Sequence, residues 1–199
     1  MNWTPELLGD YKQCMNDIEY FAEKHIKVRH VEYGLVPLKL NDFQKQAIKD
    51  YNEKNVFAKY ANRMEGKTTI GAIILLHHAI FNEYRVSLIM GPKLQASNEV
   101  LELIYDMHEN LPEHIQAEIV TRNKTKLEFS NRCSIISAGN NTNSGRGRTL
   151  SNIYIDESEF MNTLDEVFTS LYPCISVVNK GKLFAFTSTR TSEYFRDHK

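Results

Sequence analysis

Residues 61–69, Ala-Asn-Arg-Met-Glu-Gly-Lys-Thr-Thr, decide the fold class of this chain. They follow a short apolar run at 56–58 and open an amphipathic run at 70–81. A strand, a tight loop and a helix that begins at Gly-Lys-Thr are typical of a phosphate-binding loop, because backbone N–H groups and the helix dipole face the anion. In such a loop Lys67 reaches the β- and γ-phosphates, and Thr68 ligates Mg²⁺.

The match to a phosphate-binding loop is incomplete. The usual pattern has a glycine five residues before Gly66, and this chain has Ala61 there. Gly-Lys-Thr alone is common by chance, and the same residues suit an ordinary helix start with one lysine and two threonines. The interpretation therefore needs a second motif further along the chain.

Residues 152–157, Asn-Ile-Tyr-Ile-Asp-Glu, supply that second motif. An apolar strand that ends in Asp156 and Glu157 places two carboxylates at the carboxyl edge of a sheet, where open α/β sheets bind ligands. Asp156 then suits the role of a Walker B aspartate that holds Mg²⁺, and Glu157 that of a base for the attacking water. Helix capping by acids is the alternative, but the upstream phosphate loop favours the functional interpretation.

Length and composition indicate one globular domain. The chain has 199 residues, of which 42% are hydrophobic, and a mean hydropathy of -0.43. It has no run of the roughly 18–20 apolar residues that a membrane span needs, and its first residues lack the features of a signal peptide. The cysteines, Cys14, Cys133 and Cys174, show no metal-binding spacing and indicate a reducing compartment.

Charge gives a weaker signal about partners. The net charge of -1 argues against a globally basic protein that binds nucleic acid. Residues 118–148 nevertheless carry six Lys or Arg against two acids. This local excess fits contacts with phosphates, and it also fits the solvated side of a hairpin, which is the commoner case for 122–132.

The hydrophobic pattern predicts alternating strands and helices. A start signal at Thr4-Pro5 and apolar steps of three and four predict a helix to about residue 24, and Asn41 caps a second helix over 42–53. Apolar runs predict strands at 56–60, 85–90, 152–155 and 182–186, and helices at 68–82, 96–110 and about 164–171. The segment at 56–60 reads as a buried core strand, and 25–38 as irregular.

Two further segments complete the predicted architecture. Short strands at 119–121, 126–129 and 134–137 indicate a β-hairpin excursion at one sheet edge, followed by a polar loop at 138–149. We therefore expect an α/β fold, a P-loop NTPase of the ASCE or RecA-like class with a central, mostly parallel sheet flanked by helices. Residues 1–40 form a predicted N-terminal helical lead-in and 41–199 the P-loop ATPase core.

Two other positions are candidates for nucleotide contacts. Gln44, beside Phe43, precedes the first strand, where an amide can both donate to and accept from adenine. An exposed polar helix residue is the simpler interpretation of Gln44. Residues 187–189, Thr-Ser-Thr, end the last strand, where hydroxyls can sense the γ-phosphate or the lytic water; ordinary turn chemistry is the alternative.

The order of all these motifs resembles one family. The features that carry the resemblance are Tyr-Phe-Ala-Glu at 20–23, Phe-Gln at 43–44, Arg-x-x-Gly-Lys-Thr-Thr at 63–69, Leu-Pro at 111–112, Arg-Gly at 146–147, Ile-Tyr-Ile-Asp-Glu at 153–157 and Thr-Ser-Thr at 187–189. Over about residues 17–195 the chain is similar to the N-terminal ATPase domain of the large terminase subunit of T4-like tailed bacteriophages, a DNA-packaging motor. In that family the missing first glycine is expected.

The resemblance implies roles for individual residues. The implied catalytic residues are Glu157, Arg63 within the phosphate loop, and Arg146 as a finger that reaches a neighbouring subunit's nucleotide, with Arg148 as its substitute. The implied metal ligands for Mg²⁺ are Thr68 and Asp156. The implied ATP-binding residues, which include an adenine pair and a motif that couples hydrolysis to DNA movement, are Phe43, Gln44, Arg63, Gly66, Lys67, Thr68, Thr69, Thr187, Ser188 and Thr189.

The resemblance also implies a function and partners. ATP hydrolysis would power translocation of double-stranded viral DNA into a procapsid in the host cytoplasm, without a membrane. The implied partners are double-stranded DNA, the portal protein and the small terminase subunit, with a homo-oligomeric ring on the portal and a monomer in isolation. The nuclease domain that follows in such proteins is expected to be absent after residue 199.

Two rival functions stay open. A helicase-type ATPase shares the glutamine and both Walker motifs, but it should carry a second RecA-like domain. A non-catalytic nucleotide-binding or assembly module is the other, and Glu65 favours it, because a carboxylate beside the phosphates would repel a nucleotide unless it points away or meets a cation.

Overall fold

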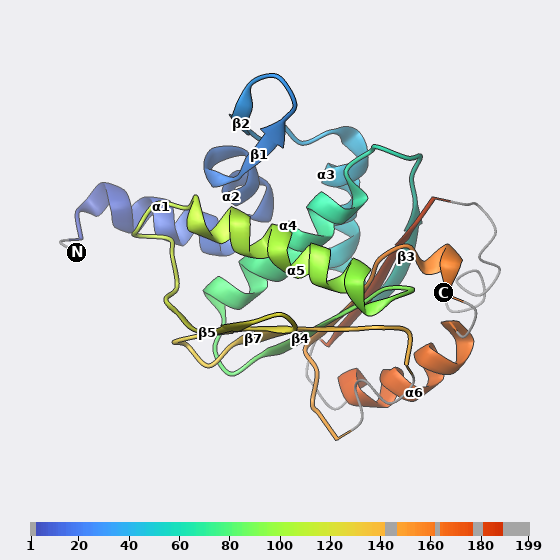
Figure 1. The fold of residues 1–199 in the computed structure, drawn as a ribbon. Coiled ribbons are helices and arrows are strands. Elements are labelled where there is room, and N and C mark those ends of the chain that lie inside the picture. Colours follow the sequence, from blue (N-terminus) through green and yellow to red (C-terminus); the bar gives the residue numbers. More distant parts are fainter. Residues whose placement is uncertain (1–2, 142–146, 162–163, 177–180, 189–199) are drawn as a thin grey trace.

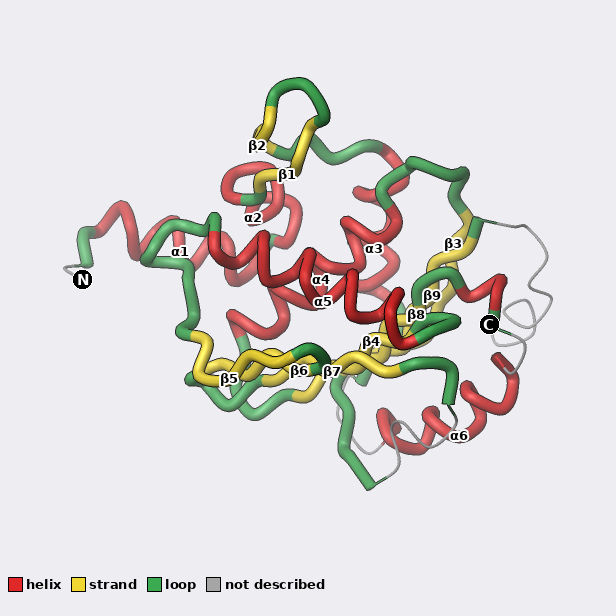
Figure 2. The backbone as a smooth tube through the Cα atoms, in the orientation of Figure 1, coloured by secondary structure: helices red, strands yellow, loops and turns green. Residues whose placement is uncertain are grey.

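A seven-stranded sheet forms the centre of the computed structural model, which describes residues 3–141, 147–161, 164–176 and 181–188. Its strand order is β3-β9-β8-β4-β7-β6-β5, and Figure 2 shows these strands as one continuous layer. The strands are β3 (Val56–Tyr60), β9 (Lys182–Thr187), β8 (Asn152–Ile155), β4 (Val86–Met90), β7 (Ser134–Ala138), β6 (Lys126–Phe129) and β5 (Ile119–Asn123).

The sheet is mostly parallel, as the sequence predicts. β3, β9, β8, β4 and β7 run parallel to one another, whereas β6 and β5 pair antiparallel at one edge.

Two details of the predicted sheet are wrong. The third short strand, β7, belongs to the parallel sheet beside β4, so the excursion is β5 and β6 alone. The segment 56–60 is the opposite edge strand and is only partly buried, because it has a single strand neighbour.

Helices cover both faces of the sheet (Figure 1). α3 (Asp42–Glu53), α4 (Lys67–Phe81) and α5 (Leu94–Glu109) lie on one face, and α6 (Leu164–Ser176) lies on the other. Alternate residues of β8 pack into different hydrophobic clusters, one on each face of the sheet. Tyr154 joins the hydrophobic cluster that contains α4, while Ile153 and Ile155 join the cluster that contains Leu171 of α6. This two-sided burial explains why the strand reads as a nearly continuous apolar run.

The N-terminal part differs from its prediction in two ways. The single helix predicted to about residue 24 is two helices, α1 (Pro5–Asn16) and α2 (Ile18–His25). Asp17 separates them in an extended conformation, and its side chain accepts a hydrogen bond from the backbone N–H of Tyr20 at 3.0 Å. This is helix capping, which aspartate favours over helix continuation.

The second difference is a hairpin in the segment that the sequence reads as irregular. β1 (Lys27–His30) and β2 (Gly34–Pro37) pair antiparallel, and Gly34 has a φ of +69° at the turn. The 1–40 lead-in is therefore helical only as far as residue 25. Among the described residues, no helix has both the length and the apolar character that crossing a membrane requires.

Candidate functional site

A cavity of about 620 Å³ lies where the phosphate loop faces the turn after β8. The short 3-10 helix η1 (Ser158–Phe160) forms part of that turn. The residues that line the cavity are Arg63, Met64, Gly66, Lys67, Thr68, Thr69, Asp156, Glu157, Glu159, Phe160 and Ser188. The two motifs singled out from the sequence therefore share one cavity at the carboxyl edge of the sheet, where ligands of such sheets bind.

The turn into α4 depends on Gly66. Its φ is +75°, a left-handed conformation that glycine adopts without strain. A Cβ at this position would lie 2.4 Å from Nε2 of Gln44, so the site has no room for a side chain. The first part of the loop is also tightly turned, because Met64 has a φ of +66°.

Gln44 and Asn41 attach the phosphate loop to α3. The Gln44 amide donates to the Gly66 carbonyl at 3.2 Å, and its oxygen accepts from the Asn41 N–H at 3.1 Å. The Asn41 amide donates to the Glu65 carbonyl at 3.0 Å. Gln44 is 3% exposed, so the alternative of an exposed polar helix residue is wrong. For Gln44 to contact adenine as predicted, its amide would have to exchange the hydrogen bonds with Asn41 and Gly66 for bonds to the base.

Phe43 packs against the sheet next to the loop. Its ring lies 5.6 Å from that of Phe186 in an edge-to-face arrangement. Neither Phe43 nor Gln44 is among the residues that line the cavity. The structure therefore places this pair outside the cavity lining, and its contact with adenine stays a prediction.

Lys67 is held by the loop itself. Its Nζ donates to the carbonyls of Ala61 at 3.1 Å and Asn62 at 2.7 Å. The Asn62 amide in turn donates to Oε1 of Glu65 at 2.7 Å. Glu65 therefore pairs with a neutral amide of its own loop, and it is not one of the cavity-lining residues.

A buried chain of hydrogen bonds joins the two motifs. The Thr68 hydroxyl donates to Oδ2 of Asp156 at 2.9 Å, and the Tyr154 hydroxyl donates to Oδ1 at 2.7 Å. Asp156 is 6% exposed. Burial raises the pKa of Asp156 above its usual value, although the two hydroxyl donors oppose the shift. The carboxylate is therefore a desolvated acceptor that a cation would stabilise.

Glu157 is exposed to the cavity and held in an unusual backbone conformation. Its φ is +50° and its ψ 44°, a left-handed conformation that is costly for a residue with a side chain. Burial, and then the charges of Asp156, Glu159 and Glu99, raise the pKa of Glu157, while Arg63 lowers it. Glu157 also lines a neighbouring cavity of about 570 Å³ with Phe160, so space for solvent lies on both sides of it.

Two residues that support the site, one lining the cavity and one buried behind Asp156, escape prediction from the sequence. Glu159 accepts hydrogen bonds from both the backbone N–H and the hydroxyl of Ser188, which joins η1 to the end of β9. Burial alone would raise the pKa of Glu159, but the bonds from Ser188 lower it. The other residue, Tyr154, is marked only by its hydroxyl in an apolar strand and by Gly71 on α4, where a Cβ would lie 2.4 Å from the Tyr154 ring.

The remaining predicted site residues lie elsewhere. Thr187 is buried at the end of β9, and Arg148 is exposed before Leu150; neither lines the cavity. Arg146 and Thr189 lie outside the described residues. Arg63, Gly66, Lys67, Thr68, Thr69, Asp156, Glu157 and Ser188 are thus the predicted residues that the structure brings together.

Solved structures with this fold include several phage terminases. The chain aligns with the large terminase of bacteriophage HK97 at a TM-score of 0.66 and 19% identity, over 88% of this chain and 37% of that one. The large terminase ATPase domain of Thermus phage P74-26 aligns at 0.60 and 15% identity, over 79% and 68%. The large terminase of the thermophilic bacteriophage D6E in complex with ADP aligns at 0.57 and 12% identity, over 73% and 38%.

These alignments show a shared fold, and the chain spans only 37% of the HK97 large terminase. A family model carries the assignment further. The model described as terminase large subunit, T4likevirus-type, N-terminal, matches residues 60–167, which is more than half of the chain and includes both the phosphate loop and the Asp156-Glu157 motif. The chain therefore belongs to the family of T4-like terminase large subunits, represented here by the N-terminal region.

Proposed function

We propose that this chain is the Mg²⁺-dependent ATPase motor domain of a DNA-packaging terminase. The hydrogen bond of 2.9 Å between Thr68 and Asp156 carries this proposal. It joins the first residues of the phosphate-loop helix to the strand that ends in two acids, and it does so at one cavity. Family membership and the ADP complex of the D6E relative support nucleotide binding by this chain.

The residues at this bond fit a magnesium ion. Mg²⁺ prefers oxygen ligands and is held by one or two protein groups with waters and phosphates. Thr68 supplies a hydroxyl and Asp156 a buried carboxylate with a raised pKa, which a divalent cation would stabilise. When bound, the ion would neutralise charge on the β- and γ-phosphates.

Basic side chains around the cavity would hold the triphosphate. Lys67 would exchange the carbonyls of Ala61 and Asn62 for phosphate oxygens, which are stronger acceptors for an ammonium group. Arg63 lines the cavity and lies close enough to Glu157 to lower its pKa. It is therefore placed to neutralise negative charge that develops on the transferred phosphate. The loop N–H groups and the N-terminus of α4 would bind the remaining oxygens.

Glu157 would act as the general base toward water. A base needs a carboxylate within hydrogen-bond reach of the attacking water and a pKa not far below the working pH. The pKa of Glu157 is shifted upward, the direction that favours a base, and the cavities on both sides of it leave space for water. Arg146 of a neighbouring subunit is the proposed finger, a contribution that can be worth about 10³–10⁵ in rate in this reaction class.

Hydrolysis would be coupled to DNA movement through Ser188. This residue follows β9 and is bonded to Glu159, which shares the short turn with Glu157. A change at the γ-phosphate would therefore reach the end of β9 through one hydrogen-bonded side chain. We propose a homo-oligomeric ring on the portal, with the small terminase subunit and double-stranded DNA as the other partners, in the host cytoplasm.

The test compares wild-type protein with Glu157→Gln and with Glu53→Gln, an exposed glutamate at the end of α3. We expect ATP turnover to fall by about 10²–10⁴ in Glu157→Gln, the usual contribution of a general base, with nucleotide affinity retained and Glu53→Gln unaffected. Steady-state phosphate release and binding of a fluorescent ATP analogue give the two readouts.

The same experiment tests the rival function of a non-catalytic module. ATP binding without turnover in the wild type, at protein concentrations that allow self-association and with DNA present, would support a non-catalytic module and contradict the proposal. The main sequence argument for that module is weaker in the structure, because Glu65 pairs with Asn62 and does not line the cavity.

A further inference from the structure

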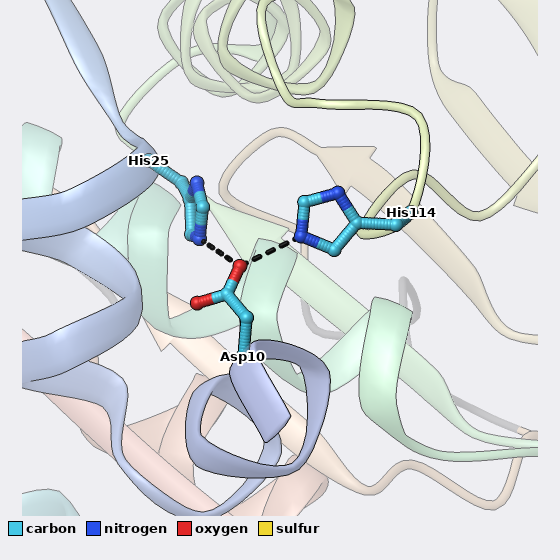
Figure 3. A group of neighbouring side chains, drawn as sticks. All are labelled: Asp10, His25 and His114. Atoms are coloured by element: carbon cyan, nitrogen blue, oxygen red, sulfur yellow. Dashed lines mark hydrogen bonds and ion pairs between the residues drawn. The ribbon is translucent and has the colours of Figure 1, made fainter. Parts of the chain in front are cut away.

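A second polar cluster, drawn in Figure 3, consists of residues that do not line the proposed ATP site. Asp10 belongs to α1, His25 ends α2, and His114 lies in the connection between α5 and β5. Nε2 of His25 lies 2.9 Å from Oδ2 of Asp10, and Nε2 of His114 lies 2.7 Å from the same oxygen. The three side chains are only about a tenth exposed.

The other oxygen of Asp10 is occupied separately. Oδ1 accepts a hydrogen bond from the Tyr20 hydroxyl at 2.9 Å and lies 2.8 Å from Nζ of Lys24. The two oxygens therefore have different tasks: Tyr20 and Lys24 fix the carboxylate through Oδ1, and both imidazoles point at Oδ2. Outer partners that hold a carboxylate in one orientation are the usual support of a metal ligand.

We propose that Oδ2 of Asp10 and the Nε2 atoms of His25 and His114 form a site for a divalent transition-metal ion of the zinc class. Two imidazoles and one carboxylate are a ligand set that suits such ions. The three ligand atoms lie within 4.8 Å of one another. Water would complete the fourth position, and the site is independent of the proposed ATPase function.

The two nitrogen–oxygen separations need only small changes to admit the ion, and the two Nε2 atoms, now within 4.8 Å of each other, would also have to take up the tetrahedral spacing. Bonds of about 2.0–2.1 Å in a tetrahedral site place ligand atoms roughly 3.3 Å apart. The present separations of 2.7 and 2.9 Å would therefore widen by about half an ångström. Each Nε2 that faces Asp10 in Figure 3 now donates a hydrogen to its carboxylate, so metal binding would leave each imidazole with its hydrogen on Nδ1 and free Nε2 to bind the ion.

Among the described residues, Lys24 is the cation that contacts the cluster and opposes the ion. Its ammonium group meets Oδ1, and its side chain is 47% exposed. It can therefore keep its hydrogen bond as an outer partner or swing into solvent when a cation binds. Its positive charge should still weaken binding, which gives the proposal a signature that a purely hydrogen-bonded cluster would lack.

The ion would link three separate parts of the chain. Residues 10, 25 and 114 come from two N-terminal helices and from the connection that follows α5, so a bound metal would tie the N-terminal helices to the ATPase core. Because the metal binds only the folded arrangement, it should raise the unfolding temperature. At free Zn²⁺ about a hundredfold above Kd, the expected rise is roughly 5–10 °C.

The test uses the full chain stripped of metal with a chelator and without nucleotide. Calorimetric titration with Zn²⁺ should give one saturable site per chain, and Co²⁺ should give the intense visible absorption of a four-coordinate ion. His114→Gln should abolish both signals and the thermal shift. His30→Gln, a change at an exposed histidine of β1, is the matched control and should keep all three.

Lys24→Gln sharpens the result. Removing the opposing charge should tighten Zn²⁺ binding by roughly tenfold or more, whereas a cluster held by hydrogen bonds alone would only lose stability. Far-ultraviolet circular dichroism checks that each variant is folded. Absence of saturable binding in the wild type, or equal binding in wild type and His114→Gln, would overturn the proposal.

Discussion

The two turns that face the cavity differ in how fully their polar groups are paired. In the phosphate loop, residues 61–66, the Asn62 amide donates a hydrogen bond to Glu65. Lys67 donates to two carbonyls of the loop, and the Gln44 amide donates to the Gly66 carbonyl. The polar groups of the turn at 156–160 are less fully paired. Burial raises the pKa of Asp156, the backbone of Glu157 is strained, and Oε2 of Glu159 is buried without a hydrogen-bond partner among the described residues.

The difference indicates where ligand binding can gain free energy. A ligand at the phosphate loop must replace bonds that the loop already makes, so binding there is an exchange. A cation at the acidic turn would instead relieve a desolvated carboxylate and oppose the repulsion between neighbouring acids. The loop should therefore contribute to stability in the free protein, and the acidic turn should detract from it.

The largest effect should come from Gly66→Ala. Alanine must adopt a φ of +75°, and its Cβ would displace the Gln44 amide from 2.4 Å. Left-handed strain and the loss of the Gln44 bond should together lower the free energy of unfolding by about 3 kcal/mol. Urea denaturation measures the change.

Gly9→Ala is the matched control for Gly66→Ala. Gly9 lies in α1, and a Cβ there would meet nothing within 4 Å. Alanine should stabilise this helix by roughly 0.5–1 kcal/mol. Equal destabilisation by the two substitutions would show that Gly66 has no special conformational role.

Tyr154→Phe should weaken the acidic turn further. The change removes a hydroxyl that donates at 2.7 Å to a buried carboxylate, which should cost about 2 kcal/mol of unfolding free energy. Tyr51→Phe is the matched control, because the Tyr51 hydroxyl donates at 2.9 Å to the neutral Asn152. Tyr154→Phe should also reduce Mg²⁺-dependent nucleotide affinity, measured by fluorescence titration, and Tyr51→Phe should not.

Lys67→Met tests the loop side of the comparison. Two bonds from a half-buried ammonium group to the carbonyls of Ala61 and Asn62 would disappear, so the free protein should lose about 1–2 kcal/mol. Affinity for ATP should fall roughly a hundredfold, since a charge-assisted contact with phosphate is lost. A variant as stable as the wild type would show that the loop does not depend on this lysine.

Much of this comparison could be predicted from the sequence. Gly-Lys-Thr after a strand and Asp-Glu after an apolar run fix which strand ends carry the chemistry, because the period of the hydrophobic pattern identifies the elements. The resemblance then correctly identified the family. The edge position of β3 could not be predicted, since its apolar residues reveal burial but not strand order.

Side-chain pairing was also beyond the sequence. In the sequence, Gln44 looks like an unpaired polar residue on a helix. Only the fold shows that its amide is hydrogen-bonded to both Asn41 and Gly66. Glu159 gains its partner, Ser188, from a strand far along the chain. The break at Asp17 was missed because the apolar spacing continues through it, while the capping bond is a local competitor that periodicity does not detect.

Asp156→Asn should have the smallest effect and the opposite sign. Because its folded pKa is raised, the ionised carboxylate opposes folding at neutral pH, and asparagine can still accept from Tyr154 or Thr68. Without metal, the variant should be more stable by roughly 0.5–2 kcal/mol at pH 7, as expected where function has cost stability. The gain should shrink as pH falls through the raised pKa and vanish below about 3.9, the ordinary value for aspartate.

Asp50→Asn supplies the contrast that makes the Asp156 result decisive. Burial alone would raise the pKa of Asp50, but Lys59 at 2.7 Å and Lys54 at 3.0 Å lower it. Its ionised form therefore stabilises the fold above its ordinary pKa and loses that effect as pH falls. Asp50→Asn should destabilise at pH 7 and converge on the wild type in acid. If Asp156→Asn followed the same course in chelator-containing buffer, Asp156 would have a structural role like that of Asp50 with its lysines, and would not be a cation ligand.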